Sequence, residues 1–528
     1  MPYSWWRTGT VYQIYPRSFQ DSDGDGVGDL EGVRRRLDYL VWLGVDAIWL
    51  SPFYPSPMHD FGYDVSDYCD VDPLFGSLAR FDALIDEAHA KGLKIIIDFV
   101  PNHTSNAHPW FLASKSARSD PKRDWYLWRD PAPNGGPPNN WFSHFGGGAW
   151  SWDEQTQQYY LHSFLPEQPD LNWRNSQVRA AMHDVLRFWL RRGVDGFRVD
   201  VISHIVKDAA FRDNPANPGW TGEGPDIVRL AQTYSSDQSE VHDVIAEMRR
   251  VVDEFDDRLL IGEIYLPIER LVAYYGKELQ GVHLPFNFQL LDARWNAAEI
   301  GRLIEKYEAA LPQGAWPNWV LSNHDRPRIA ARVGVAQARI ATMLLLTLRC
   351  TPTLYYGDEI GIGHVDIPAD RVQDPWAKRE PDLGVGRDPS RTPMQWDAGQ
   401  FAGFSTREPW LPLTPDRETR NVATMRDDNS SILALTRKLL HYRRERAPLN
   451  KGEWRLLCSS DDILAYERVS GEERVFVALN FCSEPRSCAL PTTAGATITI
   501  STHGDRCGEA VGTVLCLRGD EGVLLNSP

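Results

Sequence analysis

Short hydrophobic runs alternate along the chain with longer segments of helical periodicity. Residues 179–192 and 240–257 carry apolar side chains three and four positions apart, and Gly193 follows the first segment as a helix stop. Strands alternating with helices build a parallel sheet. Eight such units favour closure into a TIM barrel over a doubly wound open sheet. The predicted strands are Val11–Pro16, Ala47–Pro52, Lys94–Val100, Gly196–Val201, Leu259–Tyr265, Leu284–Gln289, Asn318–Asp325 and Pro352–Glu359.

Two long segments interrupt this alternation. Residues 104–172, after the third strand, are rich in Trp, Pro, Gly and Asn and predict an inserted, loop-rich domain over the barrel mouth. An irregular excursion at about 361–428 follows the eighth strand. After a last helical pattern at 432–447 the sequence becomes strand-like and predicts a C-terminal β-sandwich. The predicted domains are therefore a barrel at 1–103 and 173–450, the insert at 104–172 and the sandwich at 451–528.

Charge and hydropathy narrow the class of partner. The 528 residues carry a formal net charge of −16, which argues against a nucleic-acid partner. The longest apolar stretch, Ala341 to Leu348, is too short to cross a bilayer, and the N-terminus MPYSWWRTGT does not resemble a secretory signal. We therefore expect a cytoplasmic monomer or weak homo-oligomer that binds neither nucleic acid nor membrane.

The seven cysteines include no CxxC pair, and five of them fall in the last part of the chain. Zinc or a disulfide is conceivable there, but reduced, mostly buried thiols fit a cytosolic protein better. Aromatic residues gather in loop-like sequence such as Trp125 to Trp128 and Trp150 to Trp152. Aromatic planes beside carboxylates suit the apolar faces of sugar rings, although a large aromatic core would give the same composition.

Acidic side chains stand at the carboxyl ends of several predicted strands, where enzymes of this fold do their chemistry. They are Asp98, Asp200, Glu263 and Asp325, with His103 and His324 close by. Alternation along the fourth strand places Arg198 and Asp200 on one face, where the guanidinium would keep the carboxylate ionised. A carboxyl from the neighbouring strand could then donate a proton, and retaining glycosidases need such a pair about 5–5.5 Å apart. The alternative is an ion-pair network that only braces the barrel mouth.

Four motifs at these positions resemble the α-amylase family of glycoside hydrolases, and the resemblance covers essentially the whole chain. The motifs are DFVPNH at 98–103, GFRVD at 196–200, GE at 262–263 and SNHD at 322–325. The resemblance implies that Asp200 is the nucleophile and Glu263 the general acid/base. It also implies that Asp325 grips sugar hydroxyls and stabilises the transition state.

Within that family the chain is similar to oligo-1,6-glucosidases, dextran glucosidases and related α-glucosidases. This resemblance implies that Asp60 and Arg391 pair at the back of a blind pocket, which makes the enzyme exo-acting. It further implies a glucose site with an aromatic closure from the insert, although core packing would equally account for the two phenylalanines. The implied glucose ligands are Asp60, Tyr63, His103, Arg198, His324 and Arg391, and the closing residues are Phe145, Phe164 and Gln168.

An acidic loop after the first strand predicts a cation site. Carboxylates at every second position, with glycines between them, offer the oxygen ligands that Ca²⁺ or Mg²⁺ prefers; the expected ligands are Asp21, Asp23, Asp25, the Val27 carbonyl and Asp29. Gly32 stands where an EF-hand needs glutamate, so the loop is not an EF-hand. A similar loop in related α-glucosidases implies a structural ion, and the alternative is an acidic turn without metal. No organic cofactor is expected.

Val201 follows the predicted nucleophile and would lie near the leaving group. In the resembling enzymes valine here accompanies α-1,6 preference, whereas alanine or threonine accompanies α-1,4. We therefore expect α-1,6 linkages to be preferred, with an α-1,4-glucosidase as the alternative, since simple strand packing explains the valine equally well. A transglucosylase or sucrose isomerase would use the same glucosyl-enzyme. A non-catalytic barrel of the amino-acid transporter type is a remote alternative, since this chain keeps all three carboxylates.

Overall fold

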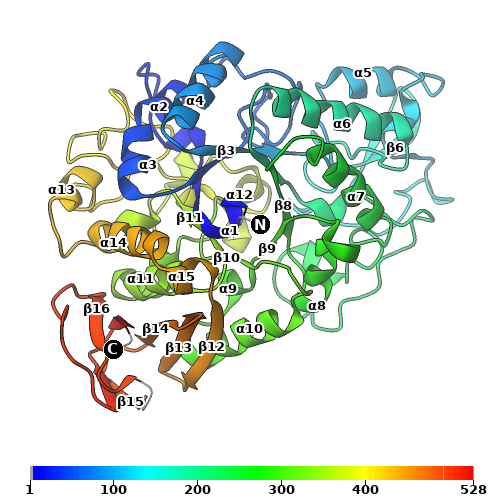
Figure 1. The fold of residues 1–528 in the computed structure, drawn as a ribbon. Coiled ribbons are helices and arrows are strands. Elements are labelled where there is room, and N and C mark those ends of the chain that lie inside the picture. The colour runs from blue at the N-terminus through cyan, green and yellow to red at the C-terminus, as the bar shows by residue number, and fades with distance from the viewer. Residues whose placement is uncertain (1–3, 491–492, 527–528) are drawn as a thin grey trace.

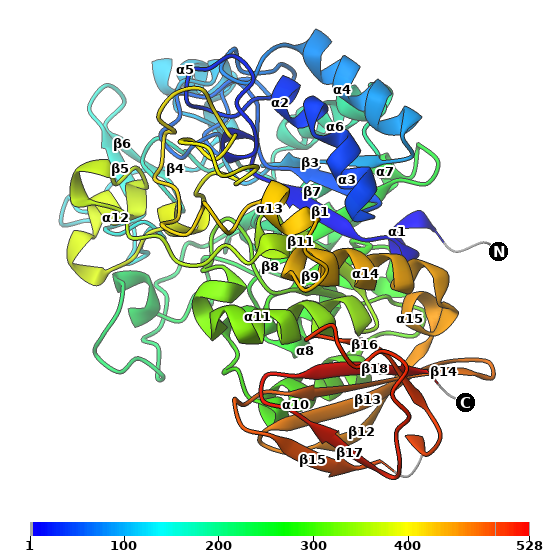
Figure 2. The same ribbon diagram turned by 90° about the vertical axis from the view of Figure 1, so that its left-hand side faces the viewer.

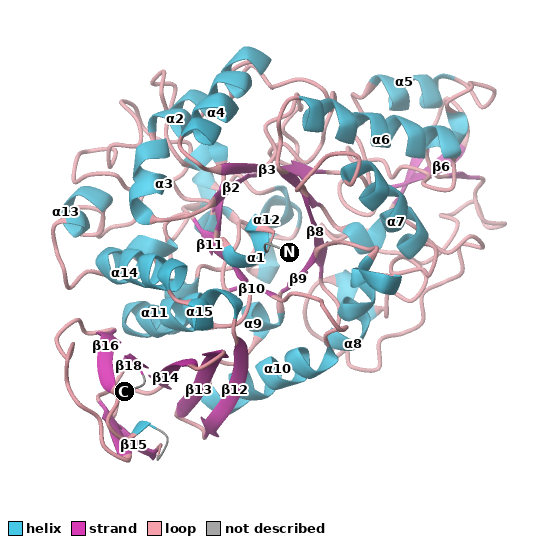
Figure 3. Ribbon diagram, in the orientation of Figure 1, coloured by secondary structure: helices cyan, strands magenta, loops and turns pink. Residues whose placement is uncertain are grey.

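A computed structural model describes residues 4–490 and 493–526, and its centre is a barrel of eight parallel strands (Figures 1 and 3). The hydrogen-bonded order is β10-β11-β1-β2-β3-β7-β8-β9, and β9 and β10 lie side by side, which nearly closes the circle. The predicted TIM barrel is therefore confirmed against an open sheet. The strands are β1 (Val11–Ile14), β2 (Ala47–Leu50), β3 (Lys94–Phe99), β7 (Gly196–Val199), β8 (Leu259–Ile264), β9 (Leu284–Asn287), β10 (Asn318–Val320) and β11 (Thr351–Tyr355).

Most barrel strands end earlier than the hydrophobic pattern predicts. The seventh strand stops at Val320, and the chain then turns so that the Asp325 N–H donates to the Asn323 side chain at 3.0 Å. The eighth strand stops at Tyr355, because Gly357 adopts a left-handed φ of 85° that leads into a 3-10 helix. Loops directly beyond the strands thus carry several of the predicted site residues.

Helices surround the barrel and cover its outer face (Figure 3). α6 is capped by the Asn175 side chain and ends before Gly193, whose φ of 99° suits the predicted stop. The predicted helix 240–257 is shorter, from Val241 to Val252. The helices are α1 (Trp5–Thr8), α2 (Leu30–Arg35), α3 (Leu37–Leu43), α4 (Leu78–Ala90), α5 (Pro109–Ser116), α6 (Ser176–Arg191), α7 (Val241–Val252), α8 (Ile268–Leu271), α9 (Gln289–Asp292), α10 (Ala297–Ala310), α11 (Ile329–Thr347), α12 (Pro375–Arg379), α13 (Val422–Arg426), α14 (Ile432–Glu445) and α15 (Ala447–Lys451).

α11 is the one described helix whose length and apolar composition would allow it to cross a membrane, and 61% of its most apolar window is buried inside the protein. It packs against α14 and against two strands of the C-terminal sheet. Its hydrophobicity is therefore accounted for by its position between the barrel and the C-terminal domain (Figure 2).

The insert at 104–172 contains α5 and a small sheet of order β4-β6-β5, and is otherwise irregular. Its strands are β4 (Trp128–Arg129), β5 (Trp150–Asp153) and β6 (Gln158–Leu161). The excursion after β11 carries α12 to the same side of the molecule (Figure 2). There the Arg379 guanidinium donates to the carbonyls of Phe145 and Gly146 at 2.9 and 3.0 Å. The insert and the excursion together therefore build up one side of the barrel mouth.

The C-terminal domain is a β-sandwich, as predicted. An antiparallel sheet of order β12-β13-β14-β18-β16 faces the pair β15-β17, with a separate hydrophobic cluster that includes Phe476, Cys488 and Leu515. The strands are β12 (Glu453–Ser459), β13 (Ile463–Ser470), β14 (Glu473–Asn480), β15 (Arg486–Ala489), β16 (Thr497–Ser501), β17 (Val514–Leu517) and β18 (Gly522–Asn526). Residues 1–3 of the N-terminal sequence and residues 491–492 and 527–528 of this domain lie outside the described residues. The numbered domain boundaries stay predictions.

All seven cysteines are free, in agreement with the expected absence of disulfides. The expectation that they are mostly buried is wrong. Only Cys350 and Cys488 are buried, and Cys507 and Cys516 are exposed. Cys516 lies on the solvent-facing side of β17, and Cys507 lies in a turn, so both thiols stay accessible.

Candidate active site

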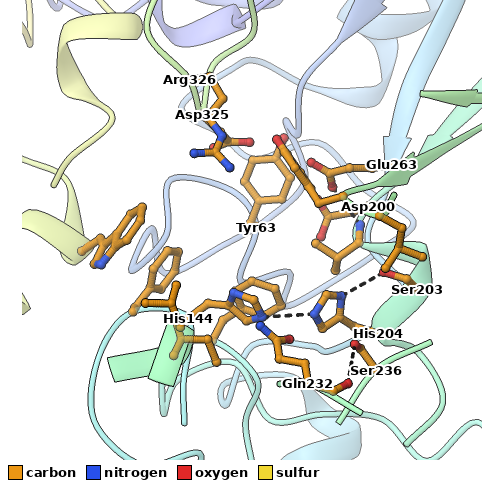
Figure 4. A pocket seen from close by; sticks show the side chains of 18 of the residues that line it. Tyr63, His144, Asp200, Ser203, His204, Gln232, Ser236, Glu263, Asp325 and Arg326 are labelled. Carbon is orange, nitrogen blue, oxygen red and sulfur yellow. Dashed lines mark hydrogen bonds between the residues drawn. The ribbon is translucent and has the colours of Figure 1, made fainter. Parts of the chain in front are cut away.

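A cavity of about 720 Å³ opens at the carboxyl ends of the barrel strands, and the predicted catalytic carboxylates line it (Figure 4). This volume falls in the range of about 300–1,000 Å³ that is typical of small-molecule sites. Asp200 and Glu263 come from adjacent strand ends, and Asp325 comes from the loop after β10. The sequence prediction that these three acids meet is therefore confirmed.

Arg198 lies at the centre of the acidic cluster and is fully buried. Its Nη1 lies 2.7 Å from Asp200 Oδ1 and 2.6 Å from Asp98 Oδ1, and its Nη2 lies 2.7 Å from Glu263 Oε2. The strand register explains part of this, because Asp98 on β3 is directly opposite Arg198 on β7. The predicted pairing of Arg198 with Asp200 is confirmed, and the same guanidinium also joins Asp200 to Glu263.

Burial changes the protonation that the sequence predicts for Asp200. It raises the pKa of Asp200 above its ordinary value; Arg198 acts in the opposite direction, and Glu263 adds to the rise. Burial also raises the pKa of Glu263, whereas Arg198 and the Val201 N–H lower it. Both carboxyls contact the same guanidinium, so their titrations are coupled. Burial and Glu263 therefore work against Arg198, and the guanidinium alone does not determine the protonation of Asp200.

Val201 adopts an unusual backbone conformation next to these acids. Its φ is 36° and its ψ is 44°, in the left-handed region that disfavours β-branched residues. Such a conformation costs about 1–3 kcal/mol and is found mainly at functional sites. Here it turns the Val201 N–H towards Glu263 Oε2, which accepts it at 2.8 Å. The Val201 side chain lines the cavity, as expected of a residue near the leaving group.

The surroundings of Asp325 lower its pKa, whereas those of Asp200 and Glu263 raise theirs. Burial acts to raise its pKa, but His324, Arg387 and Arg391 outweigh burial and lower it. The nearest atoms are Arg391 Nη2 at 3.0 Å, His324 Nε2 at 3.1 Å and Arg387 Nη1 at 3.4 Å. Asp325 therefore stays ionised beside two carboxyls whose pKa values are raised by burial.

The predicted pair of Asp60 with Arg391 is wrong, because Arg387 occupies that position. Arg387 Nη2 lies 2.6 Å from Asp60 Oδ1 and 2.7 Å from Asp374 Oδ1. Arg391 lies deeper and is fully buried; besides Asp325, its Nε donates to the His324 carbonyl at 3.0 Å. Both arginines stand in the irregular excursion, where no periodicity indicates which side chain faces the cavity. The motif GRDPSR thus predicts an arginine at this site but does not say which one.

The remaining predicted glucose ligands gather around Asp60. Tyr63 and His324 stack with parallel rings 5.4 Å apart, and Tyr63 Oη lies 2.7 Å from His324 Nε2. Gln168 Nε2 donates to Asp60 Oδ2 at 3.2 Å and lies 3.1 Å from His103 Nε2. Burial lowers the pKa of His103 to about 4, so this imidazole is neutral at neutral pH. Gln168 supports the cavity from behind, whereas Asp60, Tyr63, His103 and His324 line it.

The two predicted phenylalanines line the cavity rather than only the core of the insert. Phe145 and Phe164 meet edge to face at 5.8 Å, and the Arg387 guanidinium lies 4.7 Å above the Phe145 ring. Trp376 of α12, which the sequence analysis did not single out, lies 6.2 Å from Phe145 and also lines the cavity. The sequence offered one signal for Trp376, namely that a tryptophan stands in a long irregular segment after the eighth strand.

A buried ion pair stands behind the site and joins the insert to the barrel. Lys207 Nζ lies 2.6 Å from Asp170 Oδ2 and donates to Asn102 Oδ1 at 2.6 Å. Asn102 Nδ2 in turn lies 3.0 Å from His103 Nδ1. Lys207 follows the nucleophile strand, whereas Asp170 ends the insert. This contact therefore fixes His103 relative to both segments.

The acidic loop after β1 brings together part of the predicted cation site. Carboxylate oxygens of Asp21, Asp23 and Asp29 lie within 4.8 Å of one another, whereas Asp25 is not in this group. Asp25 instead accepts the Val27 N–H at 2.7 Å. Asp29 also caps α2 by accepting the Gly32 N–H at 2.7 Å. Three oxygen donors on a tight turn fit a hard divalent cation, but as a smaller protein ligand set than predicted.

Comparison with known proteins agrees with this geometry. The alpha-amylase catalytic-domain family matches residues 13–452. A "Probable alpha-glucosidase" of Rhizobium meliloti (strain 1021) is 42% identical over 92% of this chain and 91% of its own length. An "Oligo-1,6-glucosidase" of Parageobacillus thermoglucosidasius is 37% identical over 92% of both chains. The crystal structure of the alpha-glucosyl transfer enzyme XgtA is 41% identical, covers 100% of both chains and has a TM-score of 0.95.

Proposed function

Because the chain belongs to the alpha-amylase family of glycoside hydrolases, we propose that it is a retaining, exo-acting α-glucosidase. It releases glucose from the non-reducing end of short α-glucosides. The observation that carries this proposal is the arrangement of Asp200 and Glu263 on the single guanidinium of Arg198. Retaining glycosidases need one ionised and one protonated carboxyl at close range.

In the proposed first step, an Asp200 oxygen attacks the anomeric carbon of the terminal glucose. The bond from that carbon to the leaving oxygen breaks, and Glu263 gives its proton to that oxygen. The product is a glucosyl ester on Asp200. In the second step Glu263, now ionised, removes a proton from water, whose oxygen attacks the same carbon and releases Asp200.

The Val201 N–H supports this change of role. It donates to Glu263 Oε2, so it stabilises the carboxylate that Glu263 becomes after proton transfer. Asp325 is assigned to the sugar hydroxyls, because Arg387 and Arg391 keep it ionised and, together with His324, fix its orientation. These roles agree with the family motifs and with the positions of the side chains.

The blind end of the pocket explains exo action. Arg387 bridges Asp60, Asp374 and Asp325, so a charged cluster stands behind the glucose site and leaves no room for a further sugar. The polar atoms of Asp60 and Arg387 are instead available to the hydroxyls farthest from the reacting carbon. An endo-acting enzyme would need an open groove at this point.

Preference for α-1,6 linkages is the finer part of the proposal. The branched side chain of Val201 narrows the cavity next to Glu263, and a 1,6 linkage has one more rotatable bond with which to pass it. The similarity to an oligo-1,6-glucosidase supports the same direction. An α-1,4-glucosidase is the alternative.

A transglucosylase or a sucrose isomerase uses the same glucosyl ester, and the similarity to an alpha-glucosyl transfer enzyme favours the transglucosylase as a second candidate. The products formed from concentrated maltose and sucrose separate the cases: hydrolysis gives only monosaccharides, glucose from maltose and glucose with fructose from sucrose, whereas longer or rearranged sugars indicate transfer.

A structural Ca²⁺ or Mg²⁺ on Asp21, Asp23 and Asp29 completes the proposal. Asp21 Oδ2 also accepts from Ser405 Oγ at 2.6 Å, so an ion here would tie the loop after β1 to the excursion. It lies apart from the carboxyl pair and has no part in the reaction. A cytoplasmic location and a monomeric or weakly associating state stay predictions.

The central test is Asp200→Asn assayed with an aryl α-glucoside. Without a nucleophile, turnover falls by several orders of magnitude while the circular-dichroism spectrum and Tm stay close to those of the unchanged protein. Turnover at the unchanged rate would falsify the assignment. Asp67→Asn, an exposed carboxyl outside the cavity, is the matched control.

A further inference from the structure

The cavity has two chemically different halves. Charged side chains surround the glucose site, whereas the half on the leaving-group side of Glu263 is walled by aliphatic side chains. Most of these come from residues 217–236, a segment that follows the nucleophile strand β7 in the chain. The aliphatic lining is Val201, Ile227, Val228, Leu230, Ala231 and Leu266.

The segment 217–236 is held against the loop that carries the nucleophile, which places it on the leaving-group side. The Asp237 N–H donates to the Ser203 carbonyl at 2.7 Å, and the Asp208 N–H donates to the Tyr234 carbonyl at 2.9 Å. Val228 keeps 40% of its surface exposed although it lines the cavity. The apolar wall is therefore accessible to a ligand rather than covered by other side chains.

The histidines on this wall are already occupied by protein partners. His144 Nε2 and His204 Nε2 lie 3.1 Å apart, and Ser203 Oγ lies 3.3 Å from His204 Nδ1 (Figure 4). Burial lowers the pKa of both imidazoles, that of His144 to about 4, so both are neutral at neutral pH. They serve to join the insert to the barrel loop and offer little to a sugar hydroxyl.

The other polar side chains of the wall are engaged as well. Ser236 Oγ donates to the Gln232 carbonyl at 3.2 Å. Asn217 Nδ2 donates to the Val228 carbonyl at 2.8 Å, while Asn217 Oδ1 accepts the Gly219 N–H at 2.9 Å. Among the described residues, the charged side chain left on this side is Arg326, which lies 5.2 Å over the Tyr265 ring.

The apolar lining on this side of the cavity favours an apolar leaving group over a sugar. A sugar presents hydroxyls in every direction, and those facing the aliphatic wall would lose water without gaining a partner. An alkyl or aryl group gains from the same burial, because each buried methylene favours binding. The pocket is thus complementary to glucose on one side and to hydrocarbon on the other.

We propose that the leaving-group side of this cavity selects apolar aglycones, so that α-glucosides of aliphatic and aromatic alcohols are preferred over disaccharides. The inference rests on the proposed α-glucosidase function. The bonds exchanged are those already described: the C1–oxygen bond to the alcohol breaks, Glu263 protonates that oxygen, and a neutral alcohol leaves. In reverse, an alcohol gives its proton to Glu263 and attacks the glucosyl ester, which forms an alkyl glucoside and frees Asp200.

The preference for apolar aglycones is tested by measuring kcat/KM for methyl, ethyl, propyl and butyl α-glucosides, whose leaving alcohols have closely similar acidity. Isomaltose and maltose are measured under the same conditions. We expect kcat/KM to rise by about tenfold or more from the methyl to the butyl glucoside, since each methylene in an apolar site adds severalfold discrimination. The butyl glucoside is expected to exceed both disaccharides. A flat series with active hydrolysis of isomaltose overturns the inference and leaves the proposed function standing. No hydrolysis of any of these α-glucosides overturns both.

A second experiment replaces two apolar side chains of the wall by polar ones. The double variant Ile227→Asn, Val228→Asn is expected to reduce the butyl-to-methyl ratio of kcat/KM to within about twofold of one, because the amides bind water that an alkyl chain must displace. Val41→Asn on α3, whose exposure of 41% matches that of Val228, is the control and keeps the full ratio. If the double variant lowers both rates equally and the ratio persists, the wall does not select the aglycone and the inference is wrong.

Discussion

Arg387 reaches across the back of the cavity and binds Asp60, which is 327 positions away in the chain, with 2.6 Å between Nη2 and Oδ1. Arg387→Ala would leave Asp60 buried without its partner, and truncating one member of such a pair costs about 2–5 kcal/mol. We expect kcat/KM on isomaltose to fall at least about 100-fold, mainly through KM.

The control for this variant is Arg371→Ala in the same excursion, whose ion pair with Glu408 is largely exposed. It should change kcat/KM less than about twofold, since exposed pairs contribute little. Arg387→Lys keeps the charge but not the fork that reaches Asp60 and Asp374 together, so it should recover only part of the loss. Full recovery by lysine would show that charge alone is required.

Glu263→Gln should separate substrates by their leaving groups. A sugar alkoxide needs protonation to depart, so isomaltose hydrolysis should fall by about 10²–10⁴-fold. A dinitrophenyl α-glucoside needs almost no protonation, and the first step on it should fall far less. Burst kinetics measure the two steps separately. Equal losses on both substrates would remove Glu263 from the role of proton donor.

The opposite protonation states that the mechanism requires of Asp200 and Glu263 predict a bell-shaped pH profile of kcat/KM. Activity requires one carboxyl ionised and one protonated, so it is lost at low pH when both are protonated and at high pH when both are ionised. Because burial raises the pKa of both groups, both limbs should lie above the ordinary carboxyl range. In Glu263→Gln, assayed with the dinitrophenyl glucoside, the high-pH limb should disappear. Its persistence would assign that limb to another group.

Val201→Ala should shift linkage preference. The smaller side chain widens the cavity beside Glu263, so the ratio of isomaltose to maltose hydrolysis is expected to fall by about tenfold, the effect of one to two methyl groups in a binding site. The measurement is kcat/KM on both disaccharides at equal enzyme concentration. Val201→Thr keeps the branched shape, so a retained ratio would show that shape decides, whereas a fall like that of alanine would match the threonine of the resembling α-1,4 enzymes. An unchanged ratio in the alanine variant would contradict the linkage proposal.

Chelation tests the acidic loop after β1. Dialysis against EDTA should lower Tm by a few degrees, and Ca²⁺ at about 100 times its Kd should restore about 2.7 kcal/mol of stability. Asp21→Asn should abolish the response to Ca²⁺, because Asp21 is one of the two buried members of the oxygen cluster and, unlike Asp29, does not cap α2. Glu305→Gln on the exposed face of α10 is the control. A Tm indifferent to both treatments would mean that the loop is an acidic turn.

The sequence predicted best where one local pattern determines one structure. Buried hydrophobic runs located all eight strands, and the motifs around Asp98, Asp200, Glu263 and Asp325 identified acids that the barrel brings together. Prediction failed where tertiary context decides. The excursion has no periodicity, so Arg387 and Arg391 could not be distinguished, and the chain between Gly193 and the helix at 241 gave no sign that Ile227 and Val228 face the cavity. The protonation of Asp200 depends on burial and on Glu263, neither of which a strand pattern reports.

The buried contact between Lys207 and Asp170 limits how this protein can be recombined with its relatives. Each partner alone would be an uncompensated charge in the interior, at a cost of about 3–5 kcal/mol. A chimera that takes the insert from one parent and the barrel from another must therefore inherit both residues or neither. Crossover points at the ends of the insert separate the two, and should give poorly folded protein unless both parents carry the pair.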